Sequence, residues 1–91
     1  MVSVHAEPDG DGWTCSVTVQ DREVRTEHRV IVRSQDVERW ARGRQREDVE
    51  DLVRRSFGFL LDREPPTSIL REFDLAVIQR YFPDYEDEFG P

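Results

Sequence analysis

Three stretches near the start of the chain alternate between apolar and polar side chains, which is the pattern of a strand with one buried face. They cover residues 2–6, 13–20 and 24–33, and turn-forming residues separate them. Three such strands predict an antiparallel meander whose apolar face requires a cover. The side chains expected on that face are Val2, Val4, Ala6, Trp13, Cys15, Val17, Val19, Val24, Thr26, His28, Val30 and Val32.

Apolar residues then recur at helical spacing, most clearly over residues 48–62. Their arc is wide, roughly 200° at 100° per residue, so we expect this helix to contact both the sheet and another helix. Asp48 is the expected N-cap, and Pro65 and Pro66 end the helix. The pairs Glu50–Arg54 and Asp51–Arg55 mark its solvent side.

Shorter helical signals flank this segment. Ser34 is the expected N-cap of a helix over residues 35–42 that Gly43 ends. Thr67 caps a short turn over residues 68–73, and Asp74 caps a last helix over residues 75–82. The acidic tail, residues 84–91, is expected to fray.

The order of these elements defines the expected fold class. Strands followed by segregated helices predict an α+β fold: a three-stranded antiparallel meander, then two to four helices packed on one face. With 91 residues, the chain is expected to form one domain, residues 1–91, with room for one core but little for a deep enclosed site.

Charge narrows the choice of partners. Residues 1–46 carry eight Arg and eight Asp or Glu, whereas residues 47–91 carry five Arg and twelve Asp or Glu, so the net charge of −7 lies in the second half. That half would repel phosphate, which argues against nucleic acid as the main partner. The single cysteine, Cys15, favours a cytoplasmic location, and we expect neither a signal peptide nor a membrane span.

The candidate chemistry is sparse. The run Asp9-Gly10-Asp11-Gly12 resembles part of a calcium loop but lacks the remaining ligands, so it is interpreted as a turn. His5, His28 and Cys15 are divided between two strand faces, which disfavours a zinc site. We therefore expect no catalytic residue, no metal and no cofactor. A pocket lined by His28 and Cys15, serving an enzyme or a ligand carrier, stays open as a lesser alternative.

Two groups of residues form a candidate contact surface. One is a basic stretch beside a tryptophan, which the outward strand residues Arg25, Arg29 and Arg33 could extend. The other comes from C-terminal aromatic residues, which exceed what one short helix must bury. The surface comprises Arg39, Trp40, Arg42, Arg44, Arg46, Tyr81 and Tyr85.

From Leu52 to Tyr85 the chain reads LVRRSFGFLLDREPPTSILREFDLAVIQRYFPDY. This segment resembles a family of short, uncharacterised bacterial proteins with a C-terminal helix, Arg-Glu-Pro and FDL-x-VI-x-x-YFP. The resemblance implies no activity and no functional residues, because that family has no assigned function.

These observations favour a small non-catalytic module for protein interaction or self-association. The alternative is a nucleic-acid-associated regulator that uses the Arg-rich face.

Overall fold

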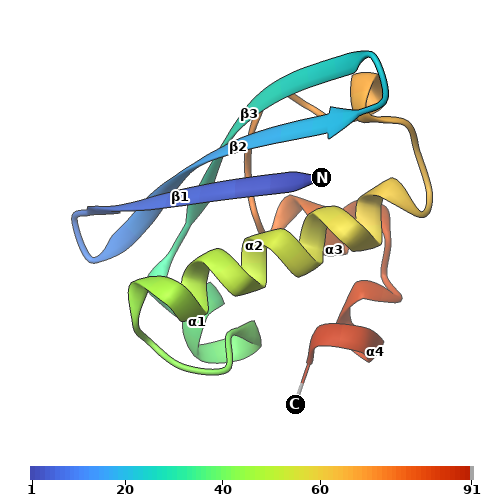
Figure 1. The fold of residues 1–91 in the computed structure, drawn as a ribbon. Helices are drawn as coiled ribbons and strands as arrows, with labels where there is room; N and C mark the ends of the chain where they lie inside the picture. The colour runs from blue at the N-terminus through green and yellow to red at the C-terminus, as the bar shows by residue number, and fades with distance from the viewer. Residues whose placement is uncertain (91) are drawn as a thin grey trace.

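The computed structural model describes residues 1–90 and places a four-stranded sheet above a layer of helices (Figure 1). Strands β1 (Val2–Asp9), β2 (Gly12–Asp21) and β3 (Val24–Val32) form the predicted antiparallel meander. A fourth strand, β4 (Glu72–Asp74), pairs with β3 in parallel, so the sheet order is β1-β2-β3-β4 and the sheet is mixed. The α+β class is confirmed, and the parallel fourth strand was not predicted.

The register of the sheet aligns the apolar face. Ala6, Cys15, Val30 and Phe73 lie opposite one another in a row across all four strands, and all four are buried. The alternation seen in the sequence therefore assigns the buried faces of the long strands correctly. Val24 departs from it: it lies at the β2–β3 turn and is 43% exposed.

Helices α1 (Ser34–Trp40) and α2 (Arg46–Leu61) begin earlier than predicted, with Arg33 and Gln45 at their N-caps. In each, an Asp three residues later accepts the backbone N–H of the N-cap residue. Asp36 lies 2.9 Å from Arg33 N and Asp48 lies 3.0 Å from Gln45 N. The predicted N-caps, Ser34 and Asp48, therefore lie inside the helices. Ser34 is the first residue of α1, and Asp48 is the third residue of α2, from which its carboxylate reaches back to the N-cap residue. α1 also ends at Trp40, before Gly43.

Helix α2 lies along the sheet beneath β1 and β2 (Figure 1). Its sheet-facing side chains include Val49, Leu52, Val53 and Phe57, all fully buried. The carboxylate of Glu50 accepts the backbone N–H of Ala6 at 2.9 Å, which ties α2 to the edge strand β1.

The chain after α2 differs most from the prediction. Pro65 and Pro66 end α2, as predicted, and a short 3₁₀ turn, η1 (Pro66–Ser68), follows. Glu72–Asp74 then form β4 where a turn was expected, and α3 (Val77–Tyr81) is shorter than the predicted helix over residues 75–82.

The described part of the acidic tail, which the sequence predicts to fray, contains a helix. Residues 85–89 form α4 (Tyr85–Phe89), and Pro91 lies outside the described residues. Tyr85 and Phe89 are buried, and their rings stack at 4.3 Å between centroids. Phe59 of α2 meets both rings edge-on, so α2 contacts a helix as well as the sheet. Apolar packing here outweighs the repulsion among neighbouring carboxylates.

Candidate functional site

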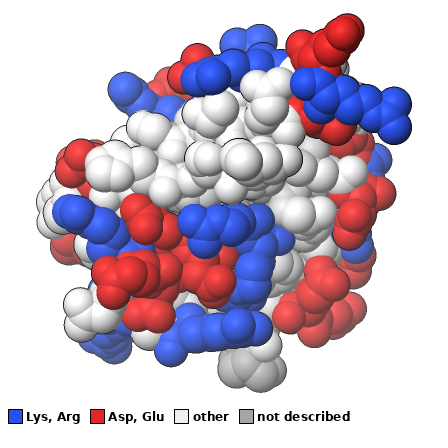
Figure 2. Space-filling model, viewed as in Figure 1, with Lys and Arg blue, Asp and Glu red and all other residues white. Residues whose placement is uncertain are grey.

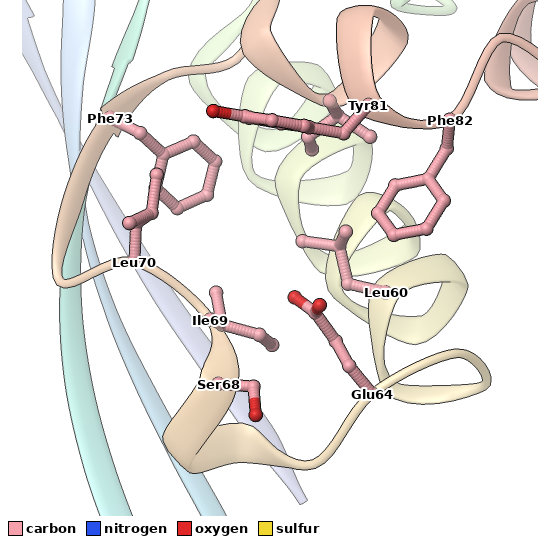
Figure 3. A pocket seen from close by; sticks show the side chains of 9 residues that line it. Leu60, Glu64, Ser68, Ile69, Leu70, Phe73, Tyr81 and Phe82 are labelled. Atoms are coloured by element: carbon pink, nitrogen blue, oxygen red, sulfur yellow. The ribbon is translucent and has the colours of Figure 1, made fainter.

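A groove opens between the end of α2, the η1–β4 segment and α3, with a volume of about 360 Å³ (Figure 3). This size falls within the range of about 300–1,000 Å³ that is typical of ligand pockets. Pro65 and Pro66 create it locally, because they end α2 and turn the chain back so that η1 and β4 face the helix. The residues that line the groove are Leu60, Glu64, Ser68, Ile69, Leu70, Phe73, Ile78, Tyr81 and Phe82.

The floor of the groove is apolar and belongs to the core. Leu60, Ile69, Phe73 and Ile78 are all buried, and each comes from a different segment. The floor is therefore set by the packing of α2, β4 and α3 rather than by one flexible loop.

The rim exposes two large apolar residues. Leu70 is 53% exposed and Tyr81 is 71% exposed; Figure 3 shows Leu70 beside Phe73 on one side of the opening and the Tyr81 ring extending across its top toward Phe73. Exposed apolar groups beside a concave site are a usual feature of contact surfaces.

One charged side chain lies among these apolar groups. The carboxylate of Glu64 points into the groove in Figure 3, and the residue is half-buried. Within residues 1–90, no hydrogen bond or ion pair involves this carboxylate. The groove thus combines an apolar floor with one carboxylate that lacks an internal partner over this range.

The rim loop is held from the sheet side. Nδ1 of His28 lies 2.8 Å from the carbonyl oxygen of Leu70, so the ring donates its Nδ1 hydrogen to that oxygen. Nε2 of His28 lies 2.8 Å from Oγ1 of Thr26. Both ring nitrogens are engaged, which makes His28 a support of the groove rather than a free base.

The lesser alternative from the sequence, a pocket lined by His28 and Cys15, is not seen at the groove. Cys15 lies opposite Val30 in the register, whereas His28 lies opposite Val17, and neither residue lines the groove. Burial raises the pKa of the Cys15 thiol to about 12, and the charge of Glu50 adds to this. A thiol with such a pKa stays protonated at neutral pH and is a poor nucleophile.

The remaining candidate metal ligands lie on strand β1 and on the β1–β2 turn. His5 is exposed on the outer face, with Nε2 2.8 Å from Glu7 Oε1. The Asp9–Gly12 run forms the β1–β2 turn, where Gly10 takes a left-handed φ of 64°. Over residues 1–90 no cluster of three His, Cys, Asp or Glu residues has the geometry of a metal site.

The predicted contact surface is divided by the fold. Tyr81 lies on the groove rim, whereas Trp40 and Tyr85 are buried and pack edge-on at 5.2 Å between centroids. The Trp40 indole donates to Glu86 and the Tyr85 hydroxyl bonds Ser56. Trp40 and Tyr85 therefore anchor α1 and α4 to the core and present no contact surface.

The four arginines of the predicted contact surface are exposed, and two of them are paired with glutamates. Arg39 pairs with Glu86, and Arg44 pairs with Glu38 at 3.1 Å. Arg42 lines a separate hollow beside α4, and Arg46 stands at the start of α2. Figure 2 shows basic and acidic side chains intermingled on the face it views, with an uncharged band across the level of the long strands. Tyr81 lines the groove, and none of these arginines does.

The sequence pattern does not predict most of the groove. The sequence predicts a short turn over Ile69 and Leu70 and gives no signal at Glu64. The one available signal was the excess of C-terminal aromatic residues, which includes Phe73, Tyr81 and Phe82 of the groove.

Comparisons with known proteins add no functional information. The chain matches no protein-family model, no curated protein and no solved structure. The resemblance noted for residues 52–85 stays a prediction. Among the described residues, no helix has the length and apolar character needed to cross a bilayer.

Proposed function

We propose that this chain is a small protein-interaction module and that the groove is its docking site. The observation that carries the proposal is the pair of exposed apolar residues, Leu70 and Tyr81, beside a preformed apolar hollow. A partner that covers them removes apolar surface from water, which is the main favourable term in protein association.

The proposed occupant is a segment of a partner protein with an apolar anchor side chain. A hollow of about 360 Å³ with a buried floor accepts a side chain without rearrangement of the fold. The lone cysteine also supports a cytoplasmic setting for this interaction.

Two other functions are less well supported. A nucleic-acid regulator would need free basic charge, and the pairing of Arg39 and Arg44 with glutamates reduces it. An enzyme built on Cys15 and His28 would need a reactive thiol, which burial disfavours.

Selection from a phage-displayed random peptide library tests the proposal. The purified chain is expected to enrich peptides whose binding falls about tenfold or more in the Tyr81→Ser and Leu70→Ser variants, as for a contact at the centre of an interface. Val24→Ser is the matched control, because Val24 is also an exposed apolar residue but lies at the β2–β3 turn. Enrichment of no peptide, or equal losses in all three variants, would contradict the proposal.

A further inference from the structure

The half-buried carboxylate of Glu64 restricts what the groove can accept. An apolar occupant that covered Glu64 would strip water from its charge and leave it without a hydrogen-bond donor, which is costly. An occupant that brings a cation to the same place avoids this cost. The chain as a whole carries a net charge of −7, so it also attracts basic segments over longer distances.

The open edge of the sheet indicates the shape of the occupant. Arg29 N bonds the carbonyl of Arg71, and Leu75 N bonds the carbonyl of Ile31, so the odd-numbered residues of this segment face β3. Successive residues of a strand direct their backbone groups to opposite sides. The backbone groups of Glu72 and Asp74 therefore point away from β3, at the edge of the sheet, on either side of Phe73, which lines the groove.

A strand added at this edge would lie about 4.8 Å from β4, with alternate side chains on the face that Phe73 shares with the groove. Two side chains separated by one residue would then point into the groove together. One of them would fill the apolar hollow and the other would reach Glu64.

From these observations we infer that the groove selects an extended protein segment in which an apolar residue and a Lys or Arg residue are separated by one residue. This inference rests on the proposed function, since it names the partner chemistry of the same site. The apolar side chain contacts Leu60, Phe73 and Tyr81, and the basic side chain pairs with Glu64. Backbone hydrogen bonds to Glu72 and Asp74 align the segment.

Peptide selection on charge variants tests this recognition. The unaltered chain is expected to enrich an apolar-x-basic pattern, and Glu64→Gln is expected to weaken those peptides by about five- to tenfold, the loss of one charged contact. Glu64→Lys should instead enrich an apolar-x-acidic pattern. Asp62→Asn is the matched control, because Asp62 is an exposed carboxylate two residues earlier that does not line the groove.

The outcomes separate the inference from the proposed function. Peptides that depend on Tyr81 and Leu70 but show no basic preference, and bind the Glu64→Gln variant equally well, would overturn the inference and leave the docking site standing. Peptides that bind without dependence on Tyr81 or Leu70 would overturn both. Selected peptides N-methylated along the backbone should lose affinity where they pair with β4, and unchanged affinity at every position would contradict the strand geometry.

Discussion

His28 of β3 and Leu70 of the groove rim are joined by a hydrogen bond of 2.8 Å between the ring Nδ1 and the backbone carbonyl. The second ring nitrogen bonds Thr26, and the ring packs against Phe57 at 5.2 Å between centroids. A buried histidine of the sheet thus fixes the loop that exposes Leu70.

Replacement of His28 by Leu is expected to release this loop and to lower the free energy of unfolding by about 1–3 kcal/mol, because buried polar groups lose their partner. Urea denaturation measures the stability, and amide hydrogen exchange of residues 69–72 measures the loop. Thr26→Val is the control, because it removes the other bond of His28 and leaves the bond to Leu70. Equal exchange in the His28→Leu variant and the unaltered chain would show that the loop is held by other contacts.

The sequence predicted the long strands well because the alternation of apolar and polar side chains is a local pattern, visible within a few consecutive residues. Alternation placed Val17, Val19 and Val30 on the buried face without knowledge of the rest of the fold. The burial of Thr26 and His28 followed from the same parity, although both side chains are polar.

What the sequence could not predict depends on contacts between distant segments. β4 is only three residues long and is stabilised by parallel pairing with Arg29–Ile31 and by burial of Phe73. The groove was missed for the same reason, since Glu64, Leu70 and Tyr81 come from separate segments that line one groove only in the folded chain.

The tail was predicted to fray because four carboxylates crowd residues 84–88. In the structure Glu86 accepts hydrogen bonds from Trp40 at 3.2 Å and Gln79 at 2.9 Å, and it also pairs with Arg39. Residues from α1 and α3 therefore compensate the charge of Glu86, one of these four carboxylates.

Truncation of the tail is therefore expected to be costly. A chain that ends at Pro83 loses the buried rings of Tyr85 and Phe89 and should be less stable by at least the ~3–5 kcal/mol that one buried aromatic contributes. Tyr85→Phe is the milder companion, because it removes only the hydroxyl that bonds Ser56 at 2.7 Å, at about 1 kcal/mol. Urea denaturation compares the three proteins. A truncated chain of unchanged stability would mean that α4 does not stabilise the fold.

The rate at which the Cys15 thiol reacts reports how often the folded chain opens. Its thiol is fully buried and burial raises its pKa to about 12, so it is expected to react with a thiol-specific disulfide reagent only when the chain opens. The native protein at pH 8 should label slowly and at a rate that urea increases. Rapid and complete labelling without denaturant would contradict the burial of β2.

Asp36 predicts a pH dependence of stability. Burial raises the pKa of this carboxyl above its usual value of 3.8, and the charge of Asp74 adds to the effect. The folded state then binds a proton more tightly than the unfolded state does, so this contribution to stability is complete below pH 3.8 and is lost as the pH rises through the raised pKa.

The variant Asp36→Asn keeps an oxygen acceptor for the N–H of Arg33 but cannot ionise. Its stability relative to the unaltered chain should therefore increase from acid to neutral pH. Paired urea titrations between about pH 3 and pH 7 measure this difference in the free energy of unfolding. The contributions of the other titrating groups are the same in both proteins and cancel in the difference. A stability difference that does not change with pH would contradict the raised pKa.

The most direct measurement of the docking site is the mapping of backbone amide chemical shifts during titration with a selected peptide. We predict that the largest shifts fall on residues 64–74 and 78–82, which surround the groove, and that Tyr81→Ser raises the peptide concentration needed to produce them by about tenfold or more. Shifts concentrated instead on residues 39–46 or on the outward face of β3 would contradict this prediction.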